Sequence, residues 1–135
     1  KIAEYEKMSD DVVLDKKTLR DYLFNKKIAK CKFIMEDNKE VGFAIYFYNF
    51  STFKGKAGLY LEDIFILEEY RHKGYGKKLF LELVKEAKEN NLGRMEWTCL
   101  NWNEPSIKFY KSLGAISLDE WKTYRLDELQ IKELV

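Results

Sequence analysis

The sequence predicts an α+β fold in which a mixed, mostly antiparallel sheet is flanked by helices. Two strand-like runs, Cys31–Glu36 and Val41–Phe50, flank the turn-forming residues Asp37-Asn38-Lys39 and should pair as an antiparallel hairpin. A third strand, Leu59–Leu67, is followed by an amphipathic helix and then by the alternating run Arg94–Leu100. Strand, helix and strand in that order form a right-handed crossover, so these last two strands should lie parallel.

The composition fits a single globular domain, residues 1–135, with no disulfide, metal or membrane signal. The 24 lysines and arginines nearly balance the 23 aspartates and glutamates, which argues against a global nucleic-acid footprint. Cys31, Cys99 and the single His72 are too few for a disulfide framework or a metal-ligand cluster. No run is long and apolar enough to cross a bilayer and no signal peptide is visible, so we expect a cytoplasmic protein.

Helices are expected before the first strand and inside the crossover. Lys1–Met8 has the pattern of a helix end, and Asp15 can cap a second helix, whose apolar residues are Leu19, Tyr22 and Leu23. The crossover helix should bury one apolar stripe, made of Leu79, Phe80, Leu83, Val84 and Ala87.

The last third of the chain should hold one clear helix and two short strands. Asn103 is a good N-cap for this helix, and Gly114 is suited to end it. The strand candidates are Ala115–Leu118 and Trp121–Leu126, and Asp127–Val135 is a short terminal helix or a fraying tail.

A basic, glycine-containing turn joins the third strand to the crossover helix. It reads Arg71-His72-Lys73-Gly74-Tyr75-Gly76, which lacks the spacing of a Walker A loop and the third glycine of a dinucleotide fingerprint. Glycines used only for the geometry of a strand-to-helix turn are one reading. The other is a pyrophosphate cradle, favoured because the flanking cations add charge where the helix amides already point.

The turn and three further strings together resemble the GCN5-related N-acetyltransferase superfamily, in particular its spermidine/spermine N1-acetyltransferase branch. These strings are Tyr60-Leu61-Glu62-Asp63-Ile64-Phe65-Ile66, then Glu69-Tyr70-Arg71, then Asn101-Trp102-Asn103-Glu104-Pro105-Ser106-Ile107-Lys108-Phe109-Tyr110-Lys111. The last of them is far more specific than the glycine turn. The resemblance implies the acyl-CoA N-acyltransferase fold and acetyl-CoA as co-substrate, with no metal.

The resemblance also implies where acetyl-CoA would bind. Backbone groups of the third strand would pair with its pantetheine arm, and the glycine turn would bind its pyrophosphate. Two residues at the start of the next helix would line the same arm. This cofactor-binding set is Ile64, Phe65, Ile66, Arg71, His72, Lys73, Gly74, Tyr75, Gly76, Lys77, Asn103 and Ser106.

Two residues are the catalytic candidates. Glu62 would remove the proton of the acceptor ammonium, directly or through a water, and Tyr110 would protonate the departing thiolate. A solvent-facing strand carboxylate is the plain alternative for Glu62, and a core tyrosine at helical spacing is the alternative for Tyr110. The match to the family motifs favours the catalytic reading of both.

The acceptor is expected to be a small primary amine, polyamine-like or an amino acid. The resemblance places Tyr5, Glu6, Glu62 and Asp63 in an acidic substrate groove, which suits a cationic molecule. A further acidic residue of the family falls near Lys122, a departure that weakens the polyamine assignment more than the enzymatic one. A protein-lysine or N-terminal acetyltransferase and a non-catalytic acyl-CoA-binding module are the alternatives.

A second departure concerns the beginning of the chain. The superfamily normally opens with a strand before its first helix, and that strand is apparently lacking here, which would leave Cys31–Glu36 as an open sheet edge. Either a longer native chain or a partner would cover that edge. Because the family is commonly dimeric, we expect a homodimer with Trp121–Leu126 near the interface.

Overall fold

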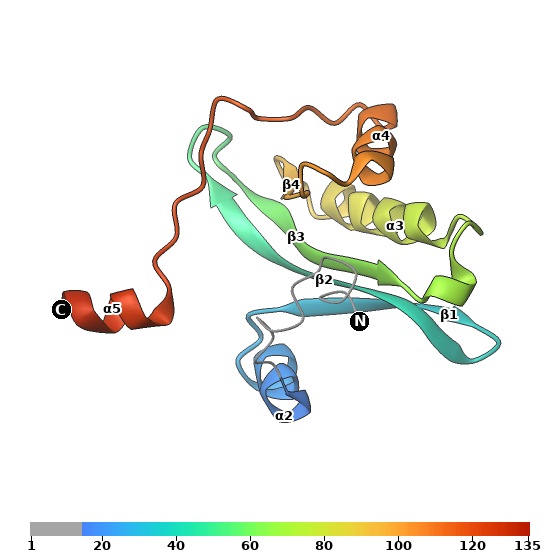
Figure 1. Ribbon diagram of the computed structural model, residues 1–135, viewed down its shortest axis with the longest axis horizontal. Helices are drawn as coiled ribbons and strands as arrows, with labels where there is room; N and C mark the ends of the chain where they lie inside the picture. The colour runs from blue at the N-terminus through green and yellow to red at the C-terminus, as the bar shows by residue number, and fades with distance from the viewer. Residues whose placement is uncertain (1–14) are drawn as a thin grey trace. The chain divides into compact units, whose positions relative to one another are not determined.

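The computed structural model describes residues 15–135 (Figure 1). The expected helix end Lys1–Met8 and the candidate residues Tyr5 and Glu6 lie outside this range. The chain divides into two units, Lys1–Thr98 and Cys99–Val135.

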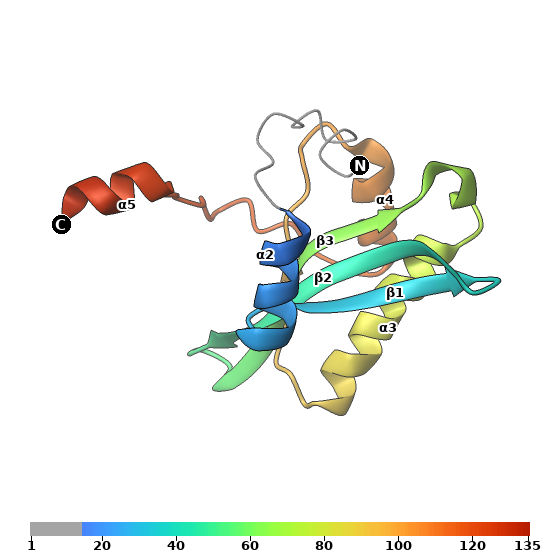
Figure 2. The ribbon, with the colours of Figure 1, turned by 90° about the horizontal axis from the view of Figure 1, so that it is seen from below.

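The first unit is built on a four-stranded sheet in the order β1-β2-β3-β4. Antiparallel pairing joins β1 to β2 and β2 to β3, whereas β3 and β4 are parallel, as the sequence predicts. Figure 2 shows β1, β2 and β3 side by side, with α3 (Tyr75–Glu89) running across them. The strands are β1 (Lys30–Glu36), β2 (Lys39–Ser51), β3 (Lys56–Ile66) and β4 (Met95–Trp97).

The first hairpin is closed by a two-residue turn. Asp37 and Asn38 have φ angles of +50° and +63°, and Glu36 pairs with Lys39 across the turn. Positive φ at both central positions is the geometry that matches the twist of antiparallel strands, and Asp and Asn tolerate it better than most residues. The turn therefore fixes the register of β1 against β2.

Helix α3 (Tyr75–Glu89) covers one face of this sheet and supplies much of the core. Leu79, Phe80 and Leu83 are buried where α3 contacts β1, β2 and β3, and the buried residues of these strands include Val41 and Leu59. Burying such side chains contributes roughly 1.5–3 kcal/mol each. The expectation that Val84 is buried is wrong, since its side chain is 40% exposed. Val84 lies on the flank of the stripe, about 90° around the helix from its centre.

The short helix before β1 begins as predicted. Asp15 is the N-cap of α2 (Lys16–Arg20), and its Oδ1 accepts a hydrogen bond of 2.7 Å from the amide of Thr18. The helix then widens into a π-helical turn, η2 (Asp21–Asn25). A short 3-10 turn, η3 (Glu68–Tyr70), links β3 to the glycine turn.

The second unit contains α4 (Glu104–Ser112) and α5 (Glu128–Leu134). Gly114 follows α4 with φ +88°, the left-handed conformation that glycine adopts without strain, and Asp127 caps α5 in a capping box. The predicted strands Ala115–Leu118 and Trp121–Leu126 are wrong, because within residues 99–135 no strand forms.

The residues of those two segments favour strands, but their own unit contains no strand with which they could pair. A strand is stable only when a neighbour satisfies its backbone groups and covers one of its faces. Here Trp121 is 74% exposed and Tyr124 is 89% exposed. The predicted strand Arg94–Leu100 is likewise shorter than expected, since it is reduced to β4.

Candidate functional site

A bulge in β3 lies at the predicted catalytic carboxylate. Asp63 pairs with Ile45 and Leu61 pairs with Tyr46, so Glu62 is the extra residue with no partner on β2. A bulge bends the strand and re-aims the side chains beside it. Glu62 is exposed, whereas Asp63 is half-buried.

Burial makes the charged form of the Asp63 side chain less stable. Its side chain makes no hydrogen bond or ion pair with another of residues 15–135, and desolvation raises the pKa of its carboxyl group above the ordinary value. A cationic group beside it would recover the lost solvation of the carboxylate. Glu62 and Asp63 together therefore put two carboxylates at one irregular point of the sheet.

Beyond the bulge, β3 presents a free backbone edge. Its pairing with β4 covers only Leu59–Leu61 against Met95–Trp97, while pairing with β2 continues to Ile66. Among residues 15–98, the part of β3 from Glu62 to Ile66 thus has a strand on one side only. The end of pairing with β4 at this point leaves the edge open, and an extended ligand can add to such an edge.

The glycine turn at the end of β3 has the geometry of an anion site. His72 and Gly74 both have positive φ, +63° and +81°, and Gly74 is the N-cap of α3. A glycine cannot cap the helix with a side chain, so the first amides of α3 remain available to a ligand. Open space surrounds Gly74, because a Cβ built there meets no atom within 4 Å. These features fit the pyrophosphate of acetyl-CoA.

Both ends of this turn are held by side chains. Arg71 Nε donates a hydrogen bond of 2.9 Å to the carbonyl of Ile66, and the Arg71 guanidinium lies 5.1 Å from the Phe65 ring centroid. At the other end, the Tyr75 hydroxyl donates to Glu36 at 2.6 Å. Sequence reasoning missed Glu36, because nothing local marks a contact between residues 39 positions apart.

The remaining candidates lie on α4, in the second unit. Asn103 is the N-cap, and Ser106 and Tyr110 follow it at spacings of three and seven residues, which puts all three on one face of the helix. Each is half-buried. The Tyr110 ring contacts that of Phe109, with 5.5 Å between the two centroids.

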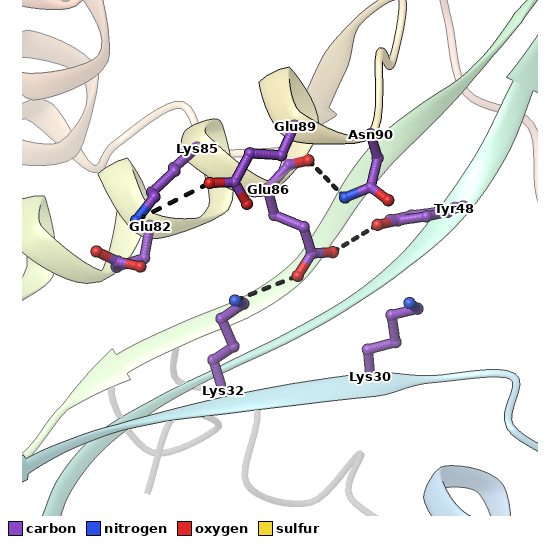
Figure 3. A pocket seen from close by; sticks show the side chains of 8 residues that line it. All are labelled: Lys30, Lys32, Tyr48, Glu82, Lys85, Glu86, Glu89 and Asn90. Atoms are coloured by element: carbon purple, nitrogen blue, oxygen red, sulfur yellow. Dashed lines mark hydrogen bonds and ion pairs between the residues drawn. The ribbon is translucent and has the colours of Figure 1, made fainter.

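A hollow lies between α3 and the strands β1 and β2, and none of the predicted site residues lines it (Figure 3). It has a volume of about 300 Å³ and brings together three lysines and three glutamates with Tyr48 and Asn90. Glu86 accepts hydrogen bonds from Tyr46 at 2.7 Å and Tyr48 at 2.6 Å, and Lys32 Nζ lies 3.2 Å from it. These contacts tie α3 to β1 and β2.

Residues 15–135 contain neither a metal-binding cluster nor a membrane-spanning helix. No cluster of three histidine, cysteine, aspartate or glutamate side chains there could hold a metal ion. No helix in the same range is long and apolar enough to cross a membrane.

Comparison with known proteins settles the family. Residues 3–115 match the model of the acetyltransferase (GNAT) family. The chain belongs to this family. The resemblance inferred from the motifs is confirmed, and so is the fold class that it implied, a mixed and mostly antiparallel sheet with helices. Acetyl-CoA is the donor that the GNAT family uses.

Individual relatives cover the chain to different extents. Thialysine N-epsilon-acetyltransferase of Bos taurus is 31% identical over 145 residues, which cover 98% of this chain and 85% of that enzyme. L-ornithine N5-acetyltransferase of Arabidopsis thaliana is 42% identical over 98 residues. That match covers 71% of this chain but only 43% of the plant enzyme, so the chain spans less than half of its length.

A solved structure extends the similarity to three dimensions. An integron cassette protein from the mobile metagenome of V. cholerae is 29% identical and superposes with a TM-score of 0.80. The match covers 98% of this chain and 84% of that protein.

Proposed function

We propose that this protein transfers an acetyl group from acetyl-CoA to a primary amine of a small amino-acid-like or polyamine-like substrate. The observation that carries the proposal is the arrangement along β3. Within one strand, a bulge presents Glu62 and Asp63, a free backbone edge follows, and the glycine turn lies at the end. Acceptor, thioester and pyrophosphate would lie along that line in this order.

The donor would be held mainly by backbone. Main-chain groups of Ile64, Phe65 and Ile66 would offer this edge to the pantetheine arm, although the Ile66 carbonyl already accepts from Arg71 Nε. The amides from Arg71 to Lys77 would surround the pyrophosphate, and among them that of Arg71 already donates to the Glu68 carbonyl at 3.2 Å. Asn103 and Ser106 are proposed to line the same arm from α4. When bound, acetyl-CoA supplies the activated acetyl group, and an amide of the β3 edge would stabilise charge on its carbonyl oxygen.

Glu62 and Tyr110 would move the protons. An amine acceptor is an ammonium in neutral water and must lose a proton before it can attack. Glu62 is exposed at the bulge and can take that proton, directly or through a water, while Asp63 attracts the cation. The hydroxyl of Tyr110 would return a proton to the departing thiolate. Tyr5 and Glu6 remain candidates for the substrate groove.

Amino-acid amines are the favoured acceptors. The relatives described above are named for acetylating ornithine at N5 and thialysine at N-epsilon, which are side-chain amines of amino acids. This supports ornithine-, lysine- and thialysine-like substrates ahead of long polyamines. The two neighbouring carboxylates suit a cationic acceptor, and they give a protein-lysine or N-terminal acetyltransferase less support.

Thiol release from acetyl-CoA, measured with a panel of amines, tests the proposal. The panel contains thialysine, ornithine, lysine, putrescine, spermidine and spermine, with Glu62→Gln as the impaired enzyme and Glu69→Gln as a matched surface control. We expect the amino-acid amines to give the highest kcat/KM and Glu62→Gln to lower it by about 100-fold. Tight CoA binding without turnover of any amine would instead support a non-catalytic acyl-CoA-binding module.

Three further parts of the proposal concern the protein as a whole. It acts as one catalytic domain, residues 1–135, in the cytoplasm. It forms a homodimer in which Trp121–Leu126 lies near the interface, because those residues expose large apolar side chains. An elution volume that corresponds to a monomer at micromolar concentration would contradict the dimer.

A further inference from the structure

The tip of the β1–β2 hairpin is tied to the glycine turn by one carboxylate. Glu36, the last residue of β1, accepts a hydrogen bond of 2.6 Å at Oε1 from the hydroxyl of Tyr75, the first residue of α3. Lys73 Nζ lies 3.6 Å from the same oxygen. Two side chains of the turn therefore converge on a single acceptor that the hairpin supplies.

Cations and one aromatic ring reinforce this link. Tyr70, just before the turn, has Lys73 Nζ 5.1 Å from its ring centroid and Lys39 Nζ at 5.5 Å. Lys39 belongs to the hairpin and Lys73 to the turn, so the ring is shared by both parts. The negative charge of Glu36 lies among these cations.

The turn is thus anchored at its two ends and exposed in its middle. Arg71 holds the first end to the carbonyl of Ile66, and Tyr75 holds the second end to Glu36. Between the anchors, His72, Lys73 and Gly74 are exposed, and two of them have positive φ. Such a backbone persists only when the surrounding contacts determine it.

We propose that Glu36 is a positioning residue for donor binding. By accepting the Tyr75 hydroxyl, it fixes the first turn of α3, and with it the free amides of the glycine turn, in the arrangement that receives a pyrophosphate before acetyl-CoA arrives. A pre-arranged site binds more tightly because less conformational freedom is lost on binding. This inference rests on the proposed function and adds a residue that lies outside the family motifs.

A purely electrostatic role for Glu36 predicts the opposite effect on CoA binding, so experiment can distinguish the two roles. A carboxylate near bound phosphates repels them, so its removal would strengthen CoA binding if Glu36 acted only through its charge. If Glu36 acts by holding Tyr75, removal of the hydrogen bond weakens CoA binding even when no charge changes.

The test compares four variants of the whole chain by calorimetric titration with CoA and by amide hydrogen exchange over residues 71–78 without ligand. Tyr75→Phe removes the hydroxyl without changing charge, and Glu36→Ala removes both the acceptor and the charge. Glu36→Gln removes the charge but keeps an oxygen acceptor. Asp37→Asn is the matched control, since it removes a neighbouring negative charge and asparagine tolerates the positive φ there.

We expect Tyr75→Phe and Glu36→Ala to weaken CoA binding by about tenfold and to accelerate exchange in the ligand-free turn, as the loss of a charge-assisted hydrogen bond implies. Glu36→Gln and Asp37→Asn should stay within about twofold of the wild type. Unchanged affinity and exchange in Tyr75→Phe would overturn the proposal, and so would tighter binding by Glu36→Ala. A wild-type protein that does not bind CoA would refute the proposed function instead, while the exchange data would still decide whether Glu36 holds the turn.

Discussion

Replacing Glu86 by alanine should cost the first unit much of its stability. The carboxylate accepts hydrogen bonds from Tyr46 and Tyr48 and faces Lys32, and its side chain is only 16% exposed. Tyr46 is 3% exposed, so its hydroxyl loses its acceptor in a place that water barely reaches. A buried donor left unpaired costs about 1–3 kcal/mol, and the more accessible bond to Tyr48 adds roughly 1 kcal/mol. We therefore expect a loss of about 2–4 kcal/mol.

Urea denaturation followed by tryptophan fluorescence measures this loss, and of the three tryptophans Trp97 reports on the core of the first unit because it packs against Phe80. The matched control is Glu89→Ala on the same helix, because Glu89 makes only an exposed ion pair of 3.9 Å with Lys85 and should contribute less than about 0.5 kcal/mol.

A double-mutant cycle with Tyr46→Phe isolates the buried hydrogen bond. The two substitutions should be non-additive by about 1 kcal/mol, since the second removes a group that the first has already left unpaired. Equal stabilities of Glu86→Ala and Glu89→Ala, or additive effects in the cycle, would refute the reasoning.

Four further outcomes follow from the same structure. Burial disfavours the charged form of Glu86, but hydrogen bonds from Tyr48 and Tyr46 outweigh this effect and lower the pKa of the carboxyl group. The stabilising effect of Glu86 should therefore be present above pH 4.5 and disappear as the pH falls through the lowered pKa. Acid titration of the wild type and of Glu86→Ala compares the two proteins. Leu83→Ala removes a fully buried side chain and should cost about 2–4 kcal/mol in urea denaturation, against a small loss for the exposed Leu81→Ala. Gly74→Ala should cost about 1–2 kcal/mol in the same assay, because φ is +81° there although the space is open. Tyr110→Phe should lower kcat more than tenfold with the calorimetric Kd for CoA unchanged, and an unchanged kcat would remove Tyr110 from the acid role.

Local chemistry explains which parts of the fold could be predicted from the sequence. The first hairpin was predicted because Asp37-Asn38 marks a tight turn, and α3 because its apolar residues repeat at helical spacing. The free amides at the start of α3 were also predictable, since Gly74, the glycine before this amphipathic helix, has no side chain that could cap them. The β3 bulge at Glu62 was not, because a shift in register depends on both strands of the pair.

Long-range contacts explain what could not be predicted. Glu36 and Glu86 each make contacts with residues about forty positions away, and nothing in the local sequence distinguishes either from an exposed glutamate. The segments Ala115–Leu118 and Trp121–Leu126 contain residues that favour strands, yet propensity cannot supply the neighbour that a strand requires. Whether a segment joins a sheet depends on its neighbouring strands as much as on its own residues.

The short parallel pairing of β3 with β4 has a consequence for the order of folding. β1, β2 and β3 form a meander whose turns are short, so their contacts close small loops and can form early. The three pairs between β3 and β4 form only after the chain has closed a loop that contains all of α3, which costs more entropy and brings few contacts in return. We expect the meander to be present in the folding transition state and β4 to dock late, so that substitutions in β4 mainly accelerate unfolding.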